Sequence, residues 1–271
     1  MALAIWTALA MLAFAGNSIL TRMAVGAGAI DAQSFALIRL VSGAFMLALV
    51  MLWRKRQWPA LRGRGPAVLG LLVYLFGFSA AYVSLSAGTG ALILFGMVQV
   101  TMFAGALLAG EAVAAKRWAG AGLALAGLVV LLAPKLVLGG LWPMLAMTAA
   151  GVGWGIYSLA GRRAGDPLAA TAANFVLAVP VAALIWAVWG GGDWLPRGVG
   201  LAVLSGAVTS GLGYALWYRV LPQLGASRAA VAQLTVPVLA ATAGLALGEP
   251  IGLRFAISAL LVLGGVALAS R

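Results

Sequence analysis

Residues 90–131 read GALILFGMVQVTMFAGALLAGEAVAAKRWAGAGLALAGLVVL and contain two long apolar runs separated by a short polar stop. The first run ends at Gly110-Glu111, a basic pair follows at Lys116 and Arg117, and the second run then begins. A membrane-spanning helix needs about 20 predominantly apolar residues, which is close to the length of each run. The stretch therefore predicts a helical hairpin that crosses a bilayer twice.

The same hairpin returns 138 positions later, from Gln233 to Ala269. The second Gly-Glu pair, Gly248-Glu249, is the strongest evidence for a repeat, because the chain has only five acidic residues. Trp6 and the residues after it recur from Trp142 at nearly the same offset. We therefore predict one unit of about 135 residues used twice, with a first five-helix half at 1–135 and a second at 136–271.

The composition places the whole chain in the membrane. Of its 271 residues, 64% are hydrophobic and 8% charged, with a mean hydropathy of +1.11; soluble domains have about 25% charged residues. The chain has no His and no Cys, which excludes histidine acid-base chemistry, thiol nucleophiles and the usual zinc sites. The net charge of +12 comes from residues in short loops, which is typical of membrane orientation and not of nucleic-acid binding.

Ten apolar runs have near-bilayer length, and we expect each to be a transmembrane helix. They are residues 2–21, 33–53, 67–86, 90–109, 117–134, 141–160, 168–189, 198–218, 227–247 and 252–270. With a cytoplasmic N-terminus, twelve basic residues lie inside and four, Arg22, Lys135, Arg197 and Arg254, lie outside. This bias predicts a multi-pass protein with both termini in the cytoplasm. The expected location is a bacterial inner membrane.

A unit of five crossings enters its second copy from the opposite face, so the two repeats are expected to be inverted. The predicted fold class is an all-α polytopic membrane protein with ten transmembrane helices, arranged as two inverted five-helix repeats around a central cavity. Inverted repeats are typical of carriers, in which rocking of one half against the other exposes a midplane site to each side in turn.

The chain resembles the drug/metabolite transporter superfamily and its ten-helix EamA-type members. The resemblance covers nearly the whole chain and rests on the two Gly-Glu hairpins and on Thr235-Val236-Pro237-Val238. Gly96-Met97-Val98-Gln99 is similar to the aromatic amino acid exporter branch, although many relatives have Pro where this chain has Gln99. The resemblance implies a basket of helices 1–4 and 6–9 around the cavity, with helices 5 and 10 at one side.

The resemblance also implies export of amino acids, including apolar and aromatic ones, and of related small metabolites by alternating access. The alternative is a carrier of another class in the superfamily, such as nucleotide-sugars, phosphorylated metabolites or small drugs. We expect no enzyme activity, no catalytic or metal-binding residue and no cofactor. The expected partners are an amino acid-like substrate and the lipid bilayer, with the chain a monomer or homodimer.

Gln99 and Pro237 occupy equivalent repeat positions about ten residues into their runs, near the midplane at 1.5 Å per residue. Gln offers donors and an acceptor, and Pro frees a backbone carbonyl, so both suit a wall that binds a zwitterion. Gln233 lies one turn before Pro237 on the same face. The alternative roles are a helix-helix hydrogen bond for Gln99 and a tolerated kink at Pro237.

Aromatic residues gather in two of the runs. Tyr74, Phe78 and Tyr82 are spaced by four and form one stripe, and Trp154 and Tyr157 lie among glycines in the sixth run. Such rings can hold an apolar or aromatic substrate side chain and present hydroxyls to its polar end. They can equally belong to interfacial belts or face lipid.

Asn17 and Arg39 are polar residues inside apolar runs. Asn17 is expected to face the bundle, either to form a hydrogen bond between helices or to form part of the substrate site. Arg39 is a candidate counter-ion for a substrate carboxylate. It lies about six residues from the outer end of its run, roughly 9 Å, and we favour an outward-reaching structural role with Asp31 as its partner.

The five acidic residues, Asp31, Glu111, Asp166, Asp193 and Glu249, all fall in predicted loops. We expect Glu111 and Glu249 to cap the helices that follow them, near Lys116 and Arg254. Because proton-coupled carriers usually hold the proton on an intramembrane carboxylate or imidazole, we predict transport without proton coupling.

Overall fold

A computed structural model describes residues 2–108, 115–138, 140–161, 165–192, 194–233 and 235–269. Over these residues the secondary structure is helical, and no strand is found among them. The elements are α1 Ala2–Val25, α2 Ala32–Trp53, α3 Gly65–Ala81, α4 Ala87–Leu108, α5 Ala115–Leu138, α6 Trp142–Gly161, α7 Pro167–Trp189, α8 Pro196–Leu204, the π-helix η1 Ser205–Leu212, α9 Gly213–Gln233, α10 Thr235–Leu245 and α11 Leu253–Ala269.

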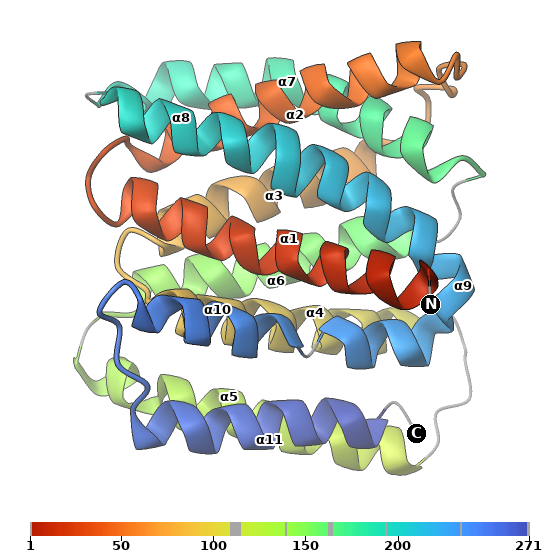
Figure 1. The fold of residues 1–271 in the computed structure, drawn as a ribbon. Helices are drawn as coiled ribbons and strands as arrows, with labels where there is room; N and C mark the ends of the chain where they lie inside the picture. The colour runs from red at the N-terminus through yellow and green to blue at the C-terminus, as the bar shows by residue number, and fades with distance from the viewer. Residues whose placement is uncertain are drawn as a thin grey trace.

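These elements supply the ten predicted crossings. Six helices are long and apolar enough to cross a membrane by length and composition, among them Pro196–Leu221, in which α8, η1 and the start of α9 are continuous. The four shorter apolar helices are Gly65–Ala81, Trp118–Leu131, Thr235–Leu245 and Leu253–Leu268. One detail differs from expectation: α9 stays helical from the eighth predicted run into the ninth, and the chain turns back within it (Figure 1). The predicted all-α membrane fold is confirmed.

Helix starts follow ordinary capping chemistry. The Asp31 carboxylate accepts a hydrogen bond from the Ser34 backbone N–H at 2.9 Å at the start of α2. Asp166 accepts from the N–H groups of Leu168 and Ala169 at the start of α7. Proline stands in the first turn of α3, α7 and α8, where its missing N–H would have no helical partner. The loops thus stop one helix and start the next within a few residues.

Several helix contacts in the first part of the chain have counterparts that involve the second part. The contact between α3 and α6 corresponds to the contact between α1 and α9. In the same way, the contact between α4 and α6 corresponds to the contact between α1 and α10. Corresponding helices also meet one another, as in α2 with α7, α4 with α10 and α5 with α11. Figure 1 shows α5 and α11 together at one edge of the bundle, with the start of α1 and the end of α11 at the same end of it. Following the predicted topology, we call this end the inner end and the opposite end the outer end.

Close helix contacts use glycine. A Cβ on Gly153 of α6 would lie 2.6 Å from the carbonyl oxygen of Gly70 in α3, so a larger residue cannot be accommodated without movement. Membrane helices associate through such small residues, because the lipid tails leave little hydrophobic drive between helices. Large apolar side chains such as Phe45 and Leu52 instead lie exposed on the outside, where lipid would contact them. The α3–α6 pair therefore forms a rigid wall beside the bundle centre.

Candidate functional site

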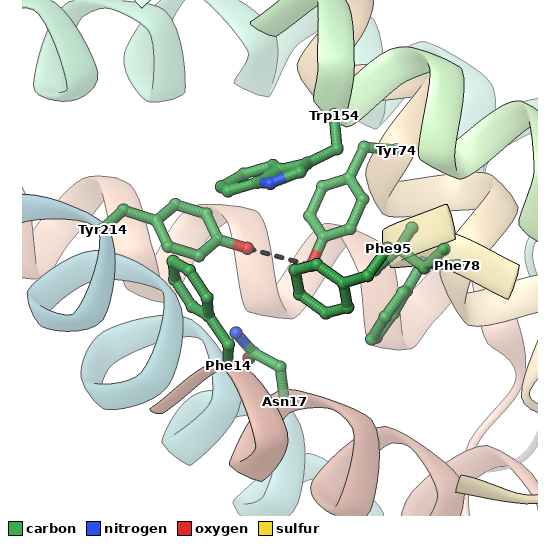
Figure 2. Close-up of a pocket in the computed structure, with 8 residues that line it drawn as sticks. Phe14, Asn17, Tyr74, Phe78, Phe95, Trp154 and Tyr214 are labelled. Atoms are coloured by element: carbon green, nitrogen blue, oxygen red, sulfur yellow. Dashed lines mark hydrogen bonds between the residues drawn. The ribbon is translucent and has the colours of Figure 1, made fainter. Parts of the chain in front are cut away.

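A small cavity lies in the middle of the bundle and is lined mainly by rings. Its lining consists of Phe14 and Asn17 of α1, Tyr74 and Phe78 of α3, Leu94 and Phe95 of α4, Trp154 of α6 and Tyr214 of α9. Figure 2 shows the Tyr74, Trp154 and Tyr214 rings turned toward one another. The free space is only about 10 Å³, which holds one water molecule at most. Both predicted halves contribute to this lining.

The rings touch one another closely enough to close the cavity. The centroids of Trp154 and Tyr214 are 4.7 Å apart, and those of Tyr74 and Trp154 are 4.9 Å apart. Phe14 packs edge-on against Trp154 at 5.9 Å and lies 6.3 Å from Phe95. Sites for small molecules typically enclose 300–1,000 Å³, so the space between these rings is far smaller than such a site.

Arg39 lies directly behind this aromatic wall and is completely buried. Its Nε donates to the Ser210 hydroxyl at 2.8 Å, and its Nη2 donates to the hydroxyls of Tyr74 at 2.8 Å and Tyr214 at 2.9 Å. The guanidinium carbon also lies 5.2 Å and 5.0 Å from the ring centroids of Tyr74 and Phe78. The charge is therefore held by neutral oxygens and ring faces from α3, η1 and α9.

This position corrects the expectation that Arg39 reaches outward. Asp31, its expected partner, instead caps α2 through the Ser34 N–H. The reason is that Tyr74, Tyr214 and Ser210 offer three oxygens inside the bundle, close enough to hold the guanidinium without a path to the surface. Among the described residues, Arg39 takes part in no ion pair.

Asn17 joins α1 to the π-helix beside Arg39. Its Oδ1 accepts hydrogen bonds from the hydroxyls of Ser205, Thr209 and Ser210, and its Nδ2 donates to the Thr209 carbonyl at 3.2 Å. A π-helix shifts backbone bonding by one residue and is often found at functional sites. Ser210 therefore contacts both Asn17 and Arg39, which links α1, α2 and η1 in one polar network.

A second polar cluster joins helix ends at the outer end of the bundle. Arg22 of α1 forms an ion pair with Glu249 at 2.7 Å, and Arg22 also donates to the carbonyls of Tyr82 and Val83. The other Glu249 oxygen accepts from the Ala87 N–H at 2.7 Å, at the first residue of α4. Glu249 thus caps a helix as expected, but it caps α4 and pairs with Arg22 where Arg254 was expected. Glu111 lies outside the described residues.

The predicted site residues divide into three groups. Asn17, Tyr74, Phe78 and Trp154 line the cavity, and Arg39 contacts two of these side chains. Tyr82 and Tyr157 lie outside the lining and contact residues that belong to it. The ring centroids of Tyr82 and Phe78 are 4.7 Å apart, and those of Tyr157 and Trp154 are 5.4 Å apart. Gln99, Gln233 and Pro237 do not belong to the lining of this cavity.

Each glutamine of the third group nevertheless has one buried amide atom without a partner. Gln99 Nε2 and Gln233 Oε1 are buried and make no hydrogen bond in the part of the chain that the structure describes. Buried polar atoms normally have partners, so an unpaired set is typical of a place that receives a ligand or water.

Sequence reasoning missed Phe14, Phe95, Ser210 and Tyr214. A signal for two of them was available, because the stripe of Tyr74, Phe78 and Tyr82 shifted by 136 positions falls on Ser210, Tyr214 and Tyr218. This is the offset that relates Trp6 to Trp142. Phe14 and Phe95 carry no comparable signal, since isolated Phe residues in apolar runs more often face lipid or neighbouring helices.

Comparisons with known proteins give consistent results. The model of the EamA-like transporter family matches residues 141–271. An uncharacterized protein of Pseudomonas aeruginosa is 50% identical over 264 residues, which cover 97% of this chain and 92% of that protein. One solved crystal structure aligns with 99% of this chain and 96% of its own chain, with a TM-score of 0.72 and 21% identity. This last likeness concerns the fold alone.

Proposed function

Because the chain belongs to the EamA-like transporter family, we propose that it carries small amphipathic metabolites across the bilayer by alternating access, with the aromatic cavity as its substrate site. The observation that carries the proposal is a polar network buried where the two predicted halves meet. Arg39, Asn17 and Ser210 are completely or almost completely buried, and polar groups at membrane depth usually mark a transport pathway.

Opening of the ring cluster and breaking of the Arg22–Glu249 ion pair are the two rearrangements that we propose for the transport cycle. The ring cluster leaves room for one water molecule at most, so the rings must separate to admit cargo. Separation of the helices at the outer end would break the ion pair. An alternating-access carrier needs states that differ in this way.

We further propose amino acids, including apolar and aromatic ones, as the first cargo class to test, with export from the cytoplasm. The aromatic lining supports an apolar or aromatic side chain, and Arg39 with the Tyr74 hydroxyl supports a carboxylate. Nucleotide-sugars and phosphorylated metabolites are less well supported, since Arg39 is the one cation beside this cavity among the described residues.

The proposed setting is a bacterial inner membrane with both termini in the cytoplasm, and the two units at 1–135 and 136–271. We propose transport without proton coupling, because the sequence has no His and its five acidic residues lie outside the predicted spans. Described acidic side chains have structural partners at helix ends: Asp31 and Asp166 cap helices and Glu249 pairs with Arg22.

An uptake screen in reconstituted vesicles tests the proposal. Purified protein in proteoliposomes is offered labelled amino acids, their carboxylate and amine analogues, and a nucleotide-sugar, with protein-free vesicles as the control. We expect saturable uptake of amphipathic acids that falls when Trp154 is replaced by Ala. Uptake that never exceeds the protein-free control for any solute would contradict the proposed function.

A further inference from the structure

Arg39 is a positive charge in the bundle interior with no negative partner among the described residues. The acidic residues that the structure describes are engaged elsewhere, with Asp31 and Asp166 capping helices and Glu249 paired with Arg22. A buried ion without a counter-charge is strongly disfavoured in a low-dielectric environment. Neutral hydroxyls and ring faces reduce this penalty but do not cancel the charge. The site is therefore electrostatically incomplete until an anion arrives.

The unpaired hydrogen-bonding groups at the cavity are donors. Arg39 Nη1 and Trp154 Nε1 are buried and have no acceptor. The Tyr74 hydroxyl accepts from both Arg39 and Tyr214, so its own hydrogen is free for an acceptor. The Asn17 Oδ1, which is the obvious acceptor in the lining, already receives three hydroxyls. A ligand that only accepts hydrogen bonds satisfies this set, and an ionised carboxylate is such a ligand.

The single positive charge of Arg39 also limits the charge that the ligand can carry and the polar groups that it can have besides the carboxylate. A dianion such as a phosphate monoester would leave about one negative charge unpaired beside apolar rings. An ammonium group needs acceptors, and no side chain in the lining of the described cavity has a buried acceptor atom without a partner. Arg39 lies over the Tyr74 and Phe78 rings, and its positive charge would repel an ammonium group placed beside it in this small space. An α-amino group would therefore gain little there.

We infer that Arg39 is the anion-binding residue of the carrier and that the cargo is an apolar monocarboxylate, for which an α-amino group is dispensable. The carboxylate binds Arg39 and the Tyr74 hydroxyl, and the apolar body lies against Phe14, Phe95 and Trp154. This inference rests on the proposed function and narrows its cargo class. It predicts that des-amino acids such as arylpropionates and 2-oxo acids bind at least as well as the matching amino acids.

Four matched ligands test the inference by calorimetry or thermal stabilisation of the purified full-length protein. They are 3-phenylpropionate, phenylalanine, 3-phenylpropionamide and phenethylamine, which share a phenylethyl skeleton and differ in the polar groups attached to it. We expect the acid to bind at least as tightly as phenylalanine and at least about tenfold more tightly than the amide, because a hydrogen bond to an ion is worth about this factor. The amine is expected to bind most weakly.

Variants of Arg39 test whether this residue causes the preference for the acid over the amide. In Arg39→Gln the acid-to-amide affinity ratio should fall to near one, and in Arg39→Lys it should be intermediate, because Lys keeps the charge but loses the planar fork. Arg254→Gln, which removes an exposed cation from α11, should leave the ratio unchanged. A ratio measured within one variant does not depend on the folded fraction. If Arg39→Gln does not fold, Tyr74→Phe should still lower the ratio.

The outcomes separate the inference from the proposed function. Binding of acids without any transport supports the anion site and contradicts the carrier. Saturable transport with an acid-to-amide ratio that is unchanged in Arg39→Gln overturns the anion site and leaves the carrier. Tighter binding of phenylalanine than of 3-phenylpropionate, or no binding of any monocarboxylate up to millimolar concentration, also overturns the inference.

Discussion

Replacing Glu249 by Gln should open the outer end of the bundle. The substitution keeps the shape of the side chain and removes its charge, which weakens the ion pair with Arg22 and the hydrogen bond from the Ala87 N–H, both 2.7 Å long. If the halves separate at this end during transport, these contacts exist only in the outer-closed state. The variant should therefore shift the equilibrium toward the outer-open state.

The size of the shift follows from the contacts. The Arg22 and Glu249 side chains are 25% and 14% exposed, so the ion pair lies between a surface pair and a buried one, and we assign it about 1 kcal/mol. Losing the charge on the acceptor of the Ala87 N–H at the start of α4 removes a further ~1–2 kcal/mol. The sum of about 2–3 kcal/mol corresponds to a 30- to 150-fold change in the ratio of open to closed molecules.

The absence of cysteine in the sequence provides a direct assay. A single Cys introduced at Leu94, which lines the cavity, is labelled from the outside by a membrane-impermeant maleimide in intact cells. We expect labelling up to 30- to 150-fold faster in Glu249→Gln, and no change in Arg197→Gln, which removes an exposed cation at the same end. Equal labelling rates with and without the Glu249 carboxylate would refute the reasoning.

Three further predictions concern the cavity and its supports. Trp154→Ala should reduce discrimination between aromatic and aliphatic cargo, measured as the ratio of their uptake rates, and an unchanged ratio would remove Trp154 from the site. Asn17→Leu should lower the free energy of unfolding in detergent by about 2 kcal/mol, because four membrane-depth hydrogen bonds are lost at roughly 0.6 kcal/mol each; a stability equal to that of the parent protein would contradict the network. A pH gradient of either sign should not drive accumulation above equilibrium in proteoliposomes, and proton-driven accumulation would show that a coupling group exists.

Much of the fold could be predicted from the sequence, because the membrane imposes simple rules. Every backbone polar group in lipid must be bonded within its own helix, so apolar runs of sufficient length become helices. Asp31 and Asp166 begin helices as acidic caps usually do. The spacing of Tyr74, Phe78 and Tyr82 placed them on one helix face, and all three are buried in the structure.

The direction of individual polar side chains could not be predicted in this way. The depth of Arg39 in its run is compatible with reaching outward or inward, and the choice depends on Tyr74, Ser210 and Tyr214, which lie 35, 171 and 175 residues away. No local pattern carries this information. Glu249 is a similar case, because its partner Arg22 is 227 positions away and the helix that it caps is α4. Long-range contacts of this kind follow from helix packing.

Counterflow exchange of 3-phenylpropionate in proteoliposomes tests most directly whether one central cavity serves both faces of the membrane in turn. Vesicles loaded with unlabelled acid are diluted into a trace of labelled acid, and the label inside is followed over time. We predict transient accumulation of label above equilibrium, which is much reduced in Trp154→Ala. A steady approach to equilibrium at a rate independent of internal acid would contradict an alternating-access carrier.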